Sequence, residues 1–216
     1  MATDAPSERT KVHRLPERGV YDRDVIDAIL DEALICHVGY IDDGHPSVIP
    51  TIHARVGDTL YIHGSNASRT LRAARSAPEI CVEVTLIDGL VLARSAFHHS
   101  MNYRSVVVYG TARPVTDAQE KFAAQKALVD HVVHGRSEDA RMPNDRELNQ
   151  TTILAVGLDE ASAKVRTGPP KDEPEDYELS VWAGIVPLRI EPGAPDPDPR
   201  LPAGVEPPPY ATDYRR

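Results

Sequence analysis

Residues 61–75 read YIHGSNASRTLRAAR. The first part is a β-rich run that ends at Gly64, and a segment with Leu71 and Ala74 at helical spacing follows at once. A strand that turns directly into a helix leaves free backbone N–H groups at the start of the helix, and these favour an anion. The turn also supplies hydroxyl groups and one planar cation, from Ser65, Ser68, Thr70 and Arg69. The stretch therefore suits one phosphomonoester, although Ser and Asn are also ordinary helix caps.

The residues before this stretch predict a helix and a three-strand meander. Segment 21–34, YDRDVIDAILDEAL, can be capped by Asp22 or Asp24 and repeats apolar residues on one face, at Val25, Ile26, Ile29, Leu30 and Ala33. Residues 34–64 are rich in β-formers, and Asp43-Gly44 and Gly57-Asp58 interrupt them as hairpin turns.

The residues after it predict a larger sheet. Two strands are expected over 80–94 and 105–115, joined by the polar and aromatic stretch 95–104. A helix over 116–134 is expected to bury Phe122, Leu128, Val129 and Val132 or Val133, and TTILAVGL and SAKVRTG read as further strands. The fold class is mainly antiparallel β with helices (α+β), as a small barrel of about six strands. We expect a polar N-terminal arm (1–19), one domain (20–188) and a Pro/Asp-rich C-terminal tail (189–216).

Composition excludes several classes of protein. The net charge is −9 and the pI is near 5.4, which opposes general nucleic-acid binding. No apolar run approaches the length of a membrane span, and the first nineteen residues are too polar for a secretory signal, so a cytoplasmic location is expected. Cys36 and Cys81 lie in apolar runs typical of buried, inert thiols.

Four stretches, in this order, resemble the pyridoxamine-phosphate-oxidase-like FMN-binding split barrels. They are GHPSVIPTIHARVGDTLYIHG (44–64), SRTLRAAR (68–75), SAFHHSMNYRSVVVYGTARPV (95–115) and SVWAGIVPL (180–188). The similarity runs from about Leu34 to Pro187 and looks strongest to the branch that contains the nitroimidazole-resistance reductases. The resemblance implies a homodimer with FMN bound between its subunits.

The resemblance also implies a set of cofactor contacts. Backbone groups on the flavin ring fall on Pro50, Thr51, Ile52 and His53, and the phosphate-binding turn falls on His63, Gly64, Ser65, Ser68 and Arg69. The family's Arg-Gln-Val strand, which lies near the cofactor, matches Arg104 and Ser105, with Ser in place of Gln. The family's late Trp, which usually reaches the flavin of the partner subunit, matches Trp182.

One departure from the family pattern bears on the reaction. True pyridoxamine phosphate oxidases follow the Trp-x-Gly element with Arg-Leu-His-Asp-Arg, which binds the vitamin, whereas this chain reads Ile185-Val186-Pro187-Leu188-Arg189. Vitamin oxidation is therefore not expected. The sequence favours an FMN-dependent oxidoreductase that takes electrons from a transiently bound NAD(P)H, there being no dinucleotide-binding GxGxxG, and acts on a small acceptor such as a nitroaromatic. The alternatives are a haem- or deazaflavin-binding split barrel, or a non-catalytic flavin carrier or sensor.

The histidines leave the catalytic residue unidentified. His98 and His99 are adjacent, so in a strand they would point to opposite faces, and no metal site is predicted from them. His63, or one of His98 and His99, is a candidate to line the flavin pocket and transfer a proton near neutral pH.

Overall fold

Ten antiparallel strands frame the structure, a computed structural model that describes residues 4–77 and 79–215. Residues 1–3 of the predicted arm and residue 216 of the predicted tail lie outside the described residues. The strands are β1 (Gly19–Val20), β2 (Ile35–Asp42), β3 (His45–Val56), β4 (Thr59–Ser65), β5 (Ile80–Leu92), β6 (Ser100–Gly110), β7 (Arg113–Pro114), β8 (Thr151–Gly157), β9 (Glu160–Arg166) and β10 (Gly184–Pro187). The predicted α+β class with a mainly antiparallel sheet is confirmed.

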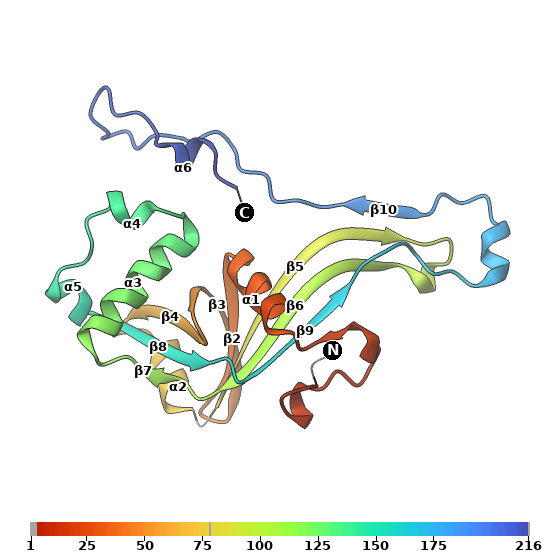
Figure 1. Cartoon of the computed structure of the whole chain (residues 1–216), viewed down its shortest axis with the longest axis horizontal. Coiled ribbons are helices and arrows are strands. Elements are labelled where there is room, and N and C mark those ends of the chain that lie inside the picture. The colour runs from red at the N-terminus through yellow and green to blue at the C-terminus, as the bar shows by residue number, and fades with distance from the viewer. Residues whose placement is uncertain (1–3, 78, 216) are drawn as a thin grey trace.

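Helices lie between and beside these strands. The α-helices are α1 (Arg23–Glu32), α2 (Arg69–Ser76), α3 (Ala118–Val132), α4 (Arg136–Asp139), α5 (Asp145–Asn149) and α6 (Pro209–Thr212). The short 3-10 helices are η1 (Glu8–Thr10), η2 (Pro16–Arg18), η3 (Ala96–His98) and η4 (Pro174–Glu178). Figure 1 shows α3, α4 and α5 grouped beside β4 and β8, and β10 at the opposite end of the molecule.

Strand β3 changes partner halfway along its length. The strand order is β1-β9-β6-β5-β2-β3-β4-β8-β7, and β10 pairs with the far end of β5. Residues 45–52 of β3 pair with β2, whereas its pairing with β4 covers only four residue pairs, from His53↔Ile62 to Val56↔Thr59. The sheet is therefore split between the first half of β3 and the last residues of β4.

Helix α1 forms the centre of the core. Asp22 caps it, since the carboxylate accepts from the N–H groups of Asp24 and Val25 at 3.0 and 3.3 Å. Its buried face joins apolar side chains of the sheet and of α2, which include Cys36, Val38, Leu60, Ile62, Leu71, Val82, Val84, Val106 and Val108. His53, fully buried on β3, donates a hydrogen bond from Nε2 to the Leu30 carbonyl at 2.8 Å and so ties the end of α1 to the sheet.

Three details of the sequence prediction were wrong. Phe122 is 41% exposed because α3 packs through Ala124 and Leu128, and a residue two positions before Ala124 points away from that face. Strand β6 begins at Ser100, since β5 is long enough to pair with it there. The count of about six strands was too low mainly because β1, β7 and β10 span only two to four residues, which is too short to show an alternating pattern.

The described parts of the arm and of the tail both contact the domain. Arg9 of the arm pairs with Glu79 and Glu160 and lies over the ring of Tyr109, and β1 adds to the edge of β9. The C-terminal tail extends past β10, and Tyr210 then accepts from Arg136 and donates to Asp139, both at 2.7 Å. Within the described residues no helix is long and apolar enough to cross a membrane.

The core of α1 gives a direct test of the fold. Ile29 is 1% exposed and Val25, on the same helix, is 37% exposed. We expect Ile29→Ala to lower the free energy of unfolding by about 2–5 kcal/mol, because it leaves a cavity, and Val25→Ala to lower it by less than about 1 kcal/mol. Urea unfolding of both variants measures this difference. Equal losses would contradict the placement of α1.

Candidate functional site

The split in the sheet places two predicted segments opposite each other. Pro50, Thr51 and Ile52 lie on β3 just before it meets β4, and His63 to Ser65 lie on β4 just after it leaves β3. In the pairing that the structure describes, these two stretches have partners only on their outer sides, β2 and β8. Their inner backbone edges thus have no strand partner in the described pairing, as at any edge strand.

The turn after β4 is ordered by its own hydroxyl groups. Ser65 Oγ accepts from the Ala67 N–H at 3.2 Å, and Ser68 Oγ caps α2 by accepting from the Leu71 N–H at 3.3 Å. A Cβ on Gly64 would lie 2.9 Å from Leu71 Cδ1, so glycine permits the close approach of the turn to α2. Asn66 holds the turn to the end of α5, where it donates to the Asn149 carbonyl, and to β8, where it accepts from the Thr152 hydroxyl. The turn is therefore preformed, and both hydroxyls retain a proton to donate.

Arg69 is an exposed cation of this turn. Its side chain is 83% exposed, and its guanidinium lies 3.8 Å from the Asp42 carboxylate, a loose contact. Arg72, by contrast, already donates to the Ala67 carbonyl at 3.0 Å. Arg69 can thus turn toward an anion bound at the start of α2 at little cost.

His63 and His53, both predicted site residues, differ in what their side chains can do. Burial lowers the pKa of His63 below its ordinary value, and its buried Nδ1 has no hydrogen-bond partner in the described part of the chain. The His53 ring faces the core and donates to Leu30, so this residue can offer only its backbone to a ligand in the split.

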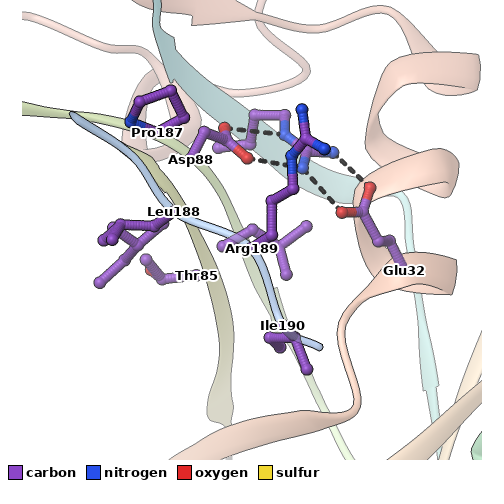
Figure 2. Close-up of a pocket in the computed structure, with 10 residues that line it drawn as sticks. Glu32, Thr85, Asp88, Pro187, Leu188, Arg189 and Ile190 are labelled. Atoms are coloured by element: carbon purple, nitrogen blue, oxygen red, sulfur yellow. Dashed lines mark hydrogen bonds and ion pairs between the residues drawn. The ribbon is translucent and has the colours of Figure 1, made fainter. Parts of the chain in front are cut away.

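Arg104 lies in a separate pocket and is held by two carboxylates. Its guanidinium contacts Glu32 at 2.5 and 2.7 Å and Asp88 at 2.8 and 3.0 Å. Figure 2 labels these two carboxylate residues and marks their interactions in the pocket with dashed lines. These hydrogen bonds, first to Glu32 and then to Asp88, raise the pKa of Arg104 further above its usual range. The pocket, about 680 Å³ in volume, is lined on one side by residues 187–190, where β10 passes into the tail. The partners of Arg104 are far apart in sequence, and no local pattern indicates them.

Ser105 points away from Arg104. It lies under the N-terminal arm, where Oγ donates to the Lys164 carbonyl at 3.4 Å. Successive residues of a strand face opposite sides, so Arg104 and Ser105 do not share one pocket within this chain.

Trp182 lies far from the split in its own chain. Pro50 pairs with His37, and His37 pairs with Glu83 of β5, whereas Gly184 pairs with Leu92 at the other end of β5. The nine residue steps from Glu83 to Leu92 correspond to roughly 30 Å along a strand. The indole is 66% exposed, and Figure 1 shows β10 and α2 at opposite ends of the molecule. Trp182 therefore cannot contact a ligand in the split of the same chain.

The two thiols take no part in this arrangement. Burial raises the pKa of Cys36 to about 12 and that of Cys81 in the same direction, which makes both unreactive. In the described residues no group of three or more His, Cys, Asp and Glu side chains is arranged to hold a metal ion.

The chain is similar in sequence and in structure to known proteins. The sequence model described as pyridoxamine 5'-phosphate oxidase matches residues 22–165. The flavocytochrome Anf3 from Azotobacter vinelandii is 40% identical, with a TM-score of 0.92 over 99% of both chains. The FAD and haem binding protein from Mycobacterium smegmatis is 38% identical, with a TM-score of 0.85 over 89% of this chain and 95% of its own.

A more distant likeness concerns the fold alone. A 5-nitroimidazole antibiotic resistance protein from Bacteroides thetaiotaomicron is 24% identical, with a TM-score of 0.58 over 68% of this chain and 86% of its own. The comparison with curated proteins found no match.

The environment of His63 predicts its titration. Its pKa lies below 6.5 in the folded state, so the unfolded chain takes up the proton first as the pH falls. The stability linked to His63 is therefore complete above about pH 6.5 and declines below it. An anion at the turn is expected to raise this pKa, because it favours the imidazolium. NMR titration with and without inorganic phosphate, with His63→Gln to identify the signal, measures both effects; a pKa above 6.5 in the free protein would contradict the described burial.

Proposed function

The chain belongs to the pyridoxamine 5'-phosphate oxidase-like family of split barrels, and from this premise we propose that it binds a flavin and a haem and transfers electrons as a flavocytochrome. The proposal of a flavin rests on the juxtaposition of the preformed turn at Ser65–Arg69 with the unpaired backbone edge of residues 50–52. The observation that carries the haem is the identity of 38–40% to two haem and flavin proteins over most of the chain.

The residues of the split fit a flavin. The turn offers N–H groups, two hydroxyls and Arg69 to a phosphate, and the inner edge of β3 offers the backbone groups of alternate residues within 50–52 to the polar rim of a ring. Val48 and Ile49, on the same strand, are 64% and 39% exposed and can cover apolar surface of a ligand or partner. Pro50 offers only its carbonyl, because proline has no N–H.

FAD is proposed in preference to the FMN expected from the sequence. One of the two relatives is an FAD and haem binding protein, and α2 presents Arg72 to solvent three residues after Arg69, where a second phosphate has a further cation within reach. A bound flavin would supply one- and two-electron transfer, and a bound haem one-electron transfer. The chain's own groups orient the flavin and shield it from water.

The site also supports a homodimer. Each chain carries a split at one end and the exposed Trp182 at the other, roughly 30 Å away along the sheet. A two-fold arrangement that places the Trp182 of one chain over the split of the next would complete two equal sites. NAD(P)H as donor, a nitroaromatic or other small acceptor and a cytoplasmic location stay predictions from the sequence.

The absorption spectrum of the purified protein tests the cofactors. We expect flavin bands near 370 and 450 nm together with a Soret band, as the chromophores themselves dictate. Chromatography of the flavin released by denaturation then distinguishes FAD from FMN. Flavin without haem after reconstitution with haemin would reduce the proposal to a flavin reductase, and uptake of neither cofactor would contradict it.

Arg69 gives a residue-level test. Arg69→Gln is expected to weaken flavin affinity by roughly 10- to 100-fold, the range for loss of a hydrogen bond to a charged group. Arg75→Gln on the same helix is the matched control, since Arg75 lies in the last turn of α2, away from the cap. Quenching of flavin fluorescence during titration of the apoprotein measures both affinities. Equal affinities of the two variants would rule Arg69 out as a phosphate ligand.

Complementation tests the shared site. If Trp182→Ala and Arg69→Gln each impair flavin binding, the co-expressed heterodimer contains one site with both changes and one intact site. We expect about half of the wild-type tight-binding stoichiometry in the purified heterodimer, and none in either homodimer. A monomeric protein, or a heterodimer no better than the homodimers, would contradict a site built from two chains.

A further inference from the structure

A second pocket lies between the N-terminal arm and η3, away from the split of the same chain. Its volume is about 590 Å³, within the usual range for a cofactor site. It is lined by four basic side chains and two imidazoles, from Arg14, Arg18, Arg166, Lys171, His98 and His99. Glu17 is the one carboxylate in this lining. In a chain of net charge −9, such a concentration of cations indicates an anionic ligand.

Arg166 is the buried cation of this pocket. The residue is 8% exposed, and its guanidinium donates to Asn102 Oδ1 and to the carbonyls of Gly168 and Pro169. Over the residues that the structure describes, it forms no ion pair with a carboxylate, and its buried Nε has no hydrogen-bond partner. Burial, followed by the nearby Arg18, lowers the pKa of Arg166. A buried charge without a counter-ion is costly, so a bound anion would stabilise this arrangement.

The hydrogen bond of the His99 imidazole leaves its Nε2 able to bind a metal ion. Its Nδ1 lies 3.0 Å from the Ser95 carbonyl, and a carbonyl can only accept, so Nδ1 carries the proton. The lone pair is then on Nε2, and the side chain of His99 is exposed. A histidine whose other ring nitrogen donates to a backbone carbonyl is the usual form of a metal-ligating imidazole.

The loop that carries His99 is firmly held. Asp172 accepts hydrogen bonds from the N–H groups of Arg94 and Ser95 at 3.0–3.2 Å, and the Arg94 guanidinium stacks on Tyr177 at 4.8 Å. Phe97, next along the loop, is 89% exposed although it is fully apolar. A flat apolar ligand would cover this ring.

The arm on the opposite wall is strained. Leu15 has φ 59° and ψ 62°, in the left-handed region that a branched side chain rarely adopts. Such strain persists where the surrounding structure imposes it, and it is concentrated at binding sites. Here it sets the arm so that Arg14 and Arg18 both line the pocket.

Resting on the function proposed above, we propose that this pocket binds the haem, with His99 Nε2 as an axial ligand of the iron and Arg166, Arg18 and Lys171 around its propionates. An imidazole can ligate the iron, cations can bind the two propionates, and an aromatic ring can cover the apolar face of the porphyrin. The pocket brings together all three.

The axial ligand is tested by spectroscopy. Protein that carries its flavin but no haem is titrated with haemin. The Soret absorbance and the electron paramagnetic resonance of the ferric iron are recorded. We expect His99→Ala to weaken haem affinity by roughly tenfold or more, to change the spin state, and to recover the wild-type spectrum with added imidazole. His45→Ala, an exposed histidine on the β2–β3 hairpin, is the matched control. A wild-type spectrum in His99→Ala would overturn the assignment.

The propionate contacts are tested separately. Haem dimethyl ester, which lacks both carboxylates, is expected to bind wild-type protein more weakly than haemin. The double variant Arg18→Gln, Lys171→Gln changes two side chains outside the core, so its folding should be preserved, and it should remove part of this preference. Equal affinity for haemin and its ester would overturn the role of the cations. Loss of flavin uptake with an unchanged haem spectrum in the double variant would assign the pocket to a nucleotide phosphate and also overturn the proposal.

These experiments distinguish failure of haem binding from failure of the assignment of haem to the second pocket. If wild-type protein shows no Soret band after reconstitution, the haem part of the proposed function fails and the assignment of the pocket falls with it. If wild-type protein binds haem and both His99→Ala and the double variant bind it identically, the proposed function stands and only the pocket assignment fails.

Discussion

The rest of the structure depends on the hydrogen bond from His53 Nε2 to the Leu30 carbonyl. It fixes α1 against β3 at the residue where β3 stops pairing with β2 and starts to pair with β4. A strand cannot follow two diverging neighbours without leaving backbone groups open, and a buried polar side chain must have a partner. Both constraints are met by one residue, and the split that results is the candidate flavin site.

The features that are set locally can be predicted from the sequence. The cap of α1, expected at Asp22 or Asp24 and found at Asp22, and the hairpin turns at Asp43-Gly44 and Gly57-Asp58 depend on neighbouring residues, and the structure has each of them. The face of α3 was partly misassigned at Phe122, because which apolar residues a helix buries depends on the surface it meets.

The long-range features could not be predicted in this way. The pairing of Arg104 with Glu32 and Asp88 joins three distant segments, and the same holds for Arg18, His99 and Arg166 around the second pocket. The separation of Trp182 from the split follows from strand register, which only the assembled sheet determines. The position of Trp182 agrees with the homodimer that the sequence predicts, whereas the proposal of a haem rests on the identity to two relatives.

The unpaired inner edges of β3 and β4 also affect the newly made chain before it binds its cofactors. Unpaired edge strands beside the exposed Val48 and Ile49 are templates for pairing with other chains, which is the route to aggregation. A ligand that fills the split removes this template and stabilises the native state by mass action. The supply of cofactor in the cell would then set how much of the newly made protein stays dispersed and how much is lost to quality control.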